Sequence, residues 1–190
     1  MIIKYLKFML NTIHLITFFL FFYLFSSALF SQTDENTENF NSNEEIRAEF
    51  GNWFQVCEKE KNQCVALQFA LNVEGERAAR FVLEKLNKND ETVADSVITI
   101  FIPFESNVPI LPNGITLTID SNDPFNEQFL FCDQLGCTSQ FGLTKQGINM
   151  LMKGANLTIS MVDIRVPNEQ YIVDIDLESF DLIYNEIITK

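Results

Sequence analysis

Segments of alternating hydrophobic and polar residues follow one another from about residue 50 to the end of the chain. In the segment 63–72, every second residue is apolar, at Val65, Leu67, Phe69 and Leu71. Alternation at period two predicts β-strands with one buried face. Comparable segments span residues 52–58, 78–86, 92–104, 115–120, 129–132, 137–141, 155–166 and 170–178. About eight short strands separated by turn residues predict a mainly β domain, either a β-sandwich or a small barrel.

Two of these segments depart from simple alternation. Residues 97–102 are apolar on both faces, which is typical of a central strand covered on both sides. In the segment 155–166 the inward set shifts by one residue, from Leu157, Ile159 and Met161 to Val162, Ile164 and Val166. Such a shift predicts a β-bulge within one long strand.

Helical spacing is confined to two places. Between Thr144 and Lys153 the apolar side chains of Ile148, Leu151 and Met152 share one face. Thr144 can cap the N-terminus of this helix, Lys153 favours its C-terminal end, and Gly154 can serve as the C′ residue. A second short helix is expected in the tail from Ser179.

The N-terminal residues match the pattern of a secretory signal peptide. Lys4 and Lys7 precede an almost wholly apolar run over residues 15–25, and the small residues Ser26 and Ala28 follow it. We therefore expect a signal peptide at residues 1–28, and hence export of the mature protein.

The alternative for this segment is an uncleaved membrane anchor. Residues 8–25 approach the roughly 18–20 residues that a spanning helix requires. Asn11, Thr12 and His14 interrupt the first half of the run, so we favour cleavage. No cysteine directly follows the apolar run, which argues against a lipoprotein-type anchor. Contact with a membrane is expected only through this segment, if it is retained.

The segment between the signal peptide and the first predicted strand spans residues 29–49, and its residues 32–49 are rich in Asn and Glu with almost no apolar side chains. Such a segment cannot bury enough surface to offset the entropy of ordering, so we expect a disordered acidic linker. The folded domain is then predicted over residues 50–190.

The formal net charge of the chain is −13. Cleavage after Ala28 removes two of the 13 basic residues and none of the 26 acidic ones, so the mature protein is more acidic still. Nucleic-acid binding requires lysine and arginine to neutralise phosphates, so this charge argues against nucleic acid as a partner. Solubility is the simple explanation of the acidity, and attraction to a basic partner is the alternative.

Four cysteines lie in the predicted domain: Cys57, Cys64, Cys132 and Cys137. Each consecutive pair flanks a short polar turn, so a hairpin would place its two members opposite each other, close enough for a bridge. We predict the disulfides Cys57–Cys64 and Cys132–Cys137. Neither spacing fits the C-x-x-C of redox enzymes, and six residues between the first pair argue against a four-cysteine zinc site.

Catalytic chemistry is poorly represented in the sequence. His14 is the single histidine and lies in the segment expected to be removed, which excludes histidine-dependent catalysis and histidine-ligated metals in the mature protein. Asp174 and Asp176 are the most obvious pair of carboxylates for a hydrolase, but they lie on the polar face of an alternating segment. We therefore predict no catalytic, cofactor-binding or metal-ligating residues and no enzymatic activity.

One loop has an oxygen-rich composition that could suit calcium. Asp120, Ser121, Asn122 and Asp123 are followed by Asn126 and Glu127. Pro124 and Phe125 stand where an EF-hand loop needs a ligand and a glycine, so we interpret the segment as an Asx-rich turn. Trp53, near the start of a predicted strand, is expected in the core.

An ordered set of short motifs runs from about residue 50 to residue 184. It consists of Phe50-Gly51-Asn52-Trp53 with Cys57 and Cys64, Pro109-Ile110-Leu111-Pro112-Asn113-Gly114-Ile115 before Ile119-Asp120, Pro124-Phe125, Phe131-Cys132-Asp133-Gln134-Leu135-Gly136-Cys137, and Leu151-Met152-Lys153-Gly154. This set resembles the invasion-associated locus B family of exported bacterial proteins. The chain departs from the family at Ser179, where a glycine is usual before Phe180.

The resemblance implies an immunoglobulin-like β-sandwich in the periplasm or at the outer envelope, and it implies no catalytic residues. The expected function is a non-enzymatic binding or structural module whose partner is an envelope protein or polymer. A surface-exposed factor for interaction with host cells is the alternative, because some family members are associated with invasion. A carboxylate-dependent hydrolase is a third, weaker hypothesis.

Overall fold

The computed structural model describes residues 43–61, 63–86 and 94–188. The predicted signal peptide and residues 29–42 of the predicted linker lie outside them. The elements, in chain order, are β1 (Glu44–Phe50), β2 (Trp53–Glu58), β3 (Cys64–Asn72), β4 (Arg77–Lys85), β5 (Ser96–Pro103), the 3-10 helix η1 (Leu111–Asn113), β6 (Ile115–Ile119), β7 (Phe125–Glu127), β8 (Phe129–Cys132), β9 (Gly136–Leu143), α2 (Lys145–Lys153), β10 (Asn156–Val162), β11 (Gln170–Asp176) and α3 (Phe180–Ile188).

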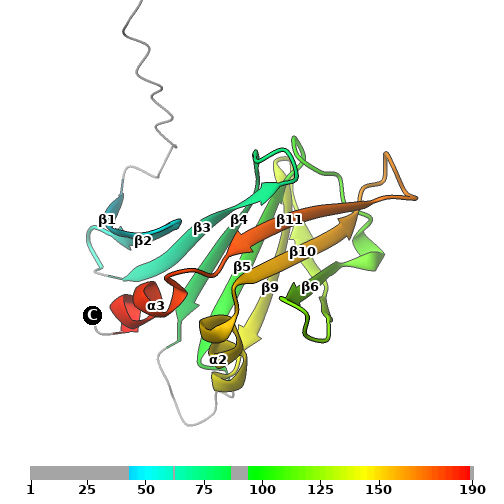
Figure 1. The fold of residues 1–190 in the computed structure, drawn as a ribbon. Helices are drawn as coiled ribbons and strands as arrows, with labels where there is room; N and C mark the ends of the chain where they lie inside the picture. The colour runs from blue at the N-terminus through cyan, green and yellow to red at the C-terminus, as the bar shows by residue number, and fades with distance from the viewer. Residues whose placement is uncertain (1–42, 62, 87–93, 189–190) are drawn as a thin grey trace, which may run out of the picture. The chain divides into compact units, whose positions relative to one another are not determined.

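The described strands form one antiparallel sheet (Figure 1). Its strand order is β7-β6-β10-β11-β3-β4-β5-β9-β8, and β2 pairs with both β1 and β3. The two ends of this path, β7 and β8, are separated in the chain by Gln128 alone. The hydroxyl of Ser139 in β9 donates to the carbonyl oxygen of Gln128 over 2.9 Å. The sheet is therefore nearly closed, because one strand segment pairs with β6 at one end and with β9 at the other.

The prediction of a mainly β fold is confirmed. Eleven strands are described where about eight were expected. All eleven belong to a single hydrogen-bonded sheet, so the immunoglobulin-like sandwich implied by the resemblance is not confirmed.

The core lies between the inner face of the sheet and the two helices. Trp53 is fully buried, as predicted, and packs edge-on against Phe81 of β4 and Phe180 of α3, with ring centroids 5.7 and 5.3 Å away. Its indole Nε1 donates to the carbonyl oxygen of Asp176 over 3.1 Å. These contacts tie β2, the end of β11 and α3 together.

A buried amide reinforces this junction. The Nε2 of Gln68 in β3 donates to the carbonyl oxygen of Asp176, and the backbone N–H of Asp176 donates to Oε1 of Gln68, over 2.9 and 2.8 Å. The side chain thus pairs the backbone N–H of Asp176 and gives its carbonyl oxygen a second donor besides the indole of Trp53.

Both predicted helices are present. Thr144 caps α2, since its hydroxyl accepts from the backbone N–H of Gly147. Gly154 follows the helix with an extended backbone (φ −75°) instead of the left-handed one expected of a C′ glycine. A Cβ at this position would lie 2.6 Å from Ile119 and 2.8 Å from Leu177, so space explains the glycine.

Two strand predictions need correction. The bulge expected in residues 155–166 is absent: β10 pairs in unbroken register with β11 and β6, and it ends at Val162. The strand at residues 97–102 is central, between β4 and β9, but only one of its faces is fully buried.

Residues 44–49, which the sequence assigned to the acidic linker, form most of β1. This strand pairs with β2 at an edge of the sheet and carries exposed charged residues, a common feature of protected edge strands. Pairing with β1 satisfies backbone groups of β2. A strand that forms for this reason leaves no hydrophobic period in the sequence, so the pattern did not predict it.

Candidate functional site

Four connections meet at one end of the sheet, and we call this region the loop end (Figure 1). It comprises residues 72–76, 104–108, 133–136 and 163–169. Hydrogen bonds join several of its parts. The N–H of Phe104 donates to the carbonyl of Leu135, the N–H of Ile164 to the carbonyl of Val108, and the guanidinium of Arg165 to the carbonyl of Ser106. In addition, the side chain of Asn72 hydrogen-bonds Tyr171, at the start of β11.

Apolar side chains project into solvent from three of these connections. The exposed fractions are 79% for Val73, 72% for Leu135, 60% for Ile164 and 47% for Val166. Single exposed apolar residues are normal in any protein, but a group of them at one end is a feature of interaction surfaces. Two further exposed residues, Leu130 and Phe131, lie on β8, which leads into the turn at residues 133–136.

The hairpin that presents Leu135 is constrained in several ways. The disulfide Cys132–Cys137 closes it, as the sequence predicted. Within the turn, Oδ1 of Asp133 accepts from the backbone N–H groups of Leu135 and Gly136, over 2.8 and 3.2 Å. A Cβ at Gly136 would lie 2.2 Å from the carbonyl oxygen of Ile102, so only glycine fits. Leu135 is therefore displayed on a turn with little freedom to move.

The buried carboxylate of Asp163 joins the connections 104–108 and 163–169. Asp163 is 3% exposed and accepts from Nδ2 of Asn107, from the N–H of Val108, and from the backbone and guanidinium of Arg165. Its close ion pair with Arg165 favours the charged form. Hydrogen bonds from Arg165 lower the pKa of the Asp163 carboxyl to about 2, against the opposing effect of burial.

The connections of the loop end also carry carboxylates. Glu74, Glu76, Glu105, Asp133 and Glu169 are exposed on the four connections. Arg77 directly follows Glu76, and Arg165 lies within the connection that contains Glu169. The loop end therefore combines exposed apolar side chains with exposed carboxylates.

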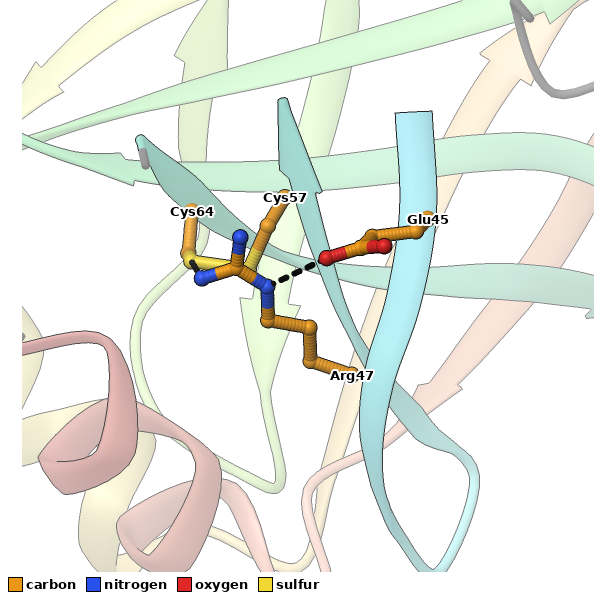
Figure 2. The surroundings of a disulfide bond; sticks show 4 residues. All are labelled: Glu45, Arg47, Cys57 and Cys64. Atoms are coloured by element: carbon orange, nitrogen blue, oxygen red, sulfur yellow. Dashed lines mark hydrogen bonds and ion pairs between the residues drawn. A yellow bond between two sulfur atoms is a disulfide. The ribbon is translucent and has the colours of Figure 1, made fainter. Parts of the chain in front are cut away.

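The second predicted disulfide is also present and lies away from the loop end. Cys57 and Cys64 form a facing pair of β2 and β3 at the start of β3, whereas the loop end begins where β3 ends. Arg47 of β1 lies beside this disulfide, with Nη1 4.0 Å from the sulfur of Cys64 and Nε 2.7 Å from a carboxylate oxygen of Glu45 (Figure 2). This disulfide fastens the β2–β3 hairpin and the edge strand next to it.

The carboxylates that the sequence singled out are engaged in structural hydrogen bonds. Asp174 accepts from Asn156 and Thr158, whereas Asp176 accepts from Asn52 and from the backbone of Glu178. The two side chains therefore share no partner.

The oxygen-rich loop is likewise organised by the backbone. The carboxylate of Asp120 accepts from the N–H groups of Ala155 and Asn156, and Asn122 donates to the carbonyl of Ile119. Within residues 43–61, 63–86 and 94–188, no group of three or more His, Cys, Asp or Glu side chains is placed to hold a metal ion. None of the helices described there is both long and apolar enough to cross a membrane.

Sequence reasoning missed the residues of the loop end. Ile164 and Val166 were expected inside, because the apolar alternation of β10 continues beyond the point where the strand ends. Leu135 is a single apolar residue in a polar turn, and Val73 follows a strand, so neither position differs in pattern from an ordinary strand boundary.

The fold and the cross-links together define a class: a mainly β domain with a nearly closed antiparallel sheet and two hairpin disulfides. Residues 53–187 match the invasion associated locus B (IalB) protein family, and the chain belongs to that family. The resemblance seen in the sequence is thereby confirmed.

Among solved structures, the crystal structure of invasion associated protein B from Bartonella henselae is similar to this chain. The TM-score is 0.59 and the sequence identity 19%, over 75% of this chain and 95% of that one. At this identity the likeness supports the fold. A search of curated proteins finds no match.

Proposed function

We propose that this chain is a non-enzymatic binding module of the bacterial envelope that holds a macromolecular partner at the loop end. The observation that carries the proposal is the group of exposed apolar side chains Val73, Leu135, Ile164 and Val166. A disulfide closes the turn of Leu135, and the ion pair of Asp163 with Arg165 fixes the connection that presents Ile164 and Val166. Loops on a rigid scaffold are common sites of recognition. Membership of the invasion associated locus B family supports an envelope role.

The charge of the loop end favours one kind of partner. Its five exposed carboxylates, on the same connections as the apolar side chains, complement a partner surface that has both apolar and basic groups. An envelope protein or polymer with such a surface is the partner we propose.

Export is part of this proposal. Two disulfides and no free cysteine among the described residues are consistent with an oxidising compartment, and the N-terminal pattern is that of a signal peptide. Intact-mass analysis of native material tests this directly: we expect loss of residues 1–28 and no alkylatable thiol. Retention of His14 together with four free thiols would contradict export.

Photo-crosslinking tests the loop end. A photoreactive residue is placed at Leu135 and, as a matched control, at Leu182 of α3, which is 51% exposed but lies outside the loop end. We expect the Leu135 probe to give a discrete crosslinked product in whole cells that the Leu182 probe does not give. Equal labelling from both positions would contradict a specific site.

A surface-exposed factor for host interaction is a second candidate. The family description and the Bartonella henselae structure both contain the words invasion associated. Protease treatment of intact cells separates the two hypotheses, since a periplasmic protein is protected and a surface-exposed one is cleaved.

For the fold, we propose that the two halves of the nearly closed sheet correspond to the layers of an immunoglobulin-like sandwich. In sandwich packing, a strand can pass from one layer to the other at a corner. We propose that the segment formed by β7 and β8 does this at Gln128. An experimental structure in which β3 keeps unbroken pairing with both β4 and β11 would favour one continuous sheet instead.

A further inference from the structure

A second candidate site lies beneath α2. A cavity of about 280 Å³ is lined by inner-face residues of β6 and β7, by the end of β9 and by α2. Its size is near the lower end of small-molecule pockets, which begin at roughly 300 Å³. The cavity lies where β7 faces β9 without a described hydrogen-bonded ladder, because β7 pairs with β6 and β9 pairs with β5 and β8.

The walls of the cavity are mainly apolar. Leu117, Phe125, Phe141, Met150 and Leu157 all contribute to them. Phe125 and Phe141 meet edge-on across the unpaired part of the sheet, with their ring centroids 6.1 Å apart. Phe125, Phe141 and Met150 are only partly buried, so the cavity reaches the surface.

One ionisable side chain, Glu127, is among the residues that line the cavity. Period-two alternation in β7 puts Glu127 on the same face as Phe125, whereas Asn126 between them is exposed and accepts from the hydroxyl of Thr116. No described residue forms an ion pair or side-chain hydrogen bond with Glu127. Burial raises the pKa of its carboxyl group, as expected for a carboxylate set against apolar walls.

A bound ligand can compensate for the hydration that the Glu127 carboxylate loses. A carboxylate that loses hydration without gaining a partner is destabilised in its charged form, and a cationic group at hydrogen-bonding distance reverses the effect. The formal charge of −13 further favours cations near the protein.

We propose that this cavity binds a small amphiphile with an apolar body and one ammonium group, the body lying against Phe125, Phe141 and Met150 and the ammonium at Glu127. Binding here is independent of the partner at the loop end.

NMR titration of the purified, disulfide-bonded protein tests the proposal with three probes of equal chain length: n-octylamine as its ammonium ion, octan-1-ol and octanoate. We expect n-octylammonium to give saturable shifts in the backbone amides of Gly142, Gly147 and Met150. The alcohol and the carboxylate should bind at least about tenfold more weakly, which corresponds to the roughly 1.4 kcal/mol that separates charge-assisted from neutral hydrogen bonds.

Two variants locate the binding. Glu127→Gln should weaken n-octylammonium binding by about tenfold or more, whereas Glu105→Gln, with the same change of charge at the loop end, should not. Gln146→Trp places a large ring on an exposed lining residue at the rim and should abolish binding without disturbing the core.

Several outcomes would overturn the proposal. Among the probes, these are equal binding of octan-1-ol and n-octylammonium, tighter binding of octanoate, and the absence of saturable shifts with any probe. Among the variants, they are equal weakening by Glu127→Gln and Glu105→Gln, and unchanged binding in Gln146→Trp. Crosslinking from Leu135 in the Glu127→Gln variant is expected to persist, so failure at this cavity can be distinguished from failure at the loop end.

Discussion

At the scale of single residues, buried polar side chains differ sharply in how well they are satisfied. Gln68 bonds both backbone groups of Asp176, and Asp163 is surrounded by donors. Gln55, on the inner face of β2, is fully buried, and neither its Nε2 nor its Oε1 has a partner among the described residues. These differences lead to opposite expectations for substitution.

A matched pair of glutamine substitutions measures this contrast. Gln68→Leu leaves the backbone of Asp176 short of partners and should lower the free energy of unfolding by about 1–3 kcal/mol. Gln55→Leu removes an unpaired amide from the core and should raise it by about 1 kcal/mol. Urea unfolding followed by tryptophan fluorescence gives both values. Equal destabilisation by the two changes would show that Gln55 has partners.

The ion pair of Asp163 predicts a particular acid sensitivity. Its folded pKa of about 2 lies below the ordinary value of 3.8, so its stabilisation is present above about pH 4 and is lost as the pH falls towards 2. Asp163→Asn should therefore lower the thermal midpoint most at neutral pH, and its difference from the wild type should shrink between pH 4 and pH 2. The exposed Asp123→Asn serves as control and should change the midpoint little at any pH. A constant difference for Asp163→Asn across this range would contradict the assignment.

At the scale of elements, the sequence predicted best where a strand has one buried face. The strands over residues 52–58, 63–72, 115–120 and 170–178 were located within one or two residues, and so was the helix capped by Thr144. Facing cysteines across short turns were enough to predict both disulfide pairings. In each case, periodicity or turn geometry is local information.

The missed elements depend on contacts that are distant in sequence. β1 is mostly polar and exists because it pairs with the edge of β2. β7 has only three residues and is defined by its pairing with β6. β10 ends at Val162 because Asp163 turns away to bond Asn107 and Arg165, although the apolar alternation continues. The loop end, which these contacts assemble, was therefore not predictable from the sequence pattern.

The two disulfides are predicted to act alike on stability and differently on binding. Replacing either pair by alanine removes a short covalent loop and should lower the free energy of unfolding by about 2 kcal/mol. Cys132→Ala with Cys137→Ala also frees the turn that holds Leu135, so it should weaken partner binding as well. Cys57→Ala with Cys64→Ala, away from the loop end, should leave binding intact. Chemical unfolding and co-purification measure the two effects, and equal loss of binding in both variants would contradict this division.

At the scale of the whole molecule, one nearly closed sheet separates two surfaces. The connections at one end present apolar and acidic groups, while α2 covers the apolar cavity at another part of the sheet. The sheet, the disulfides and the ion pair of Asp163 with Arg165 form the scaffold for both proposed sites.

The most direct test of this account is a comparison of two solvent-exposed leucines, Leu135 and Leu182. Leu135→Asp and Leu182→Asp make the same chemical change, and both are expected to leave the fold intact because both side chains are solvent-exposed. Quantitative co-purification from envelope extract should lose the crosslinked partner with Leu135→Asp, by about tenfold or more as expected for a central apolar contact, and retain it with Leu182→Asp. Full retention of that partner by Leu135→Asp would contradict the proposal that the loop end is the binding site.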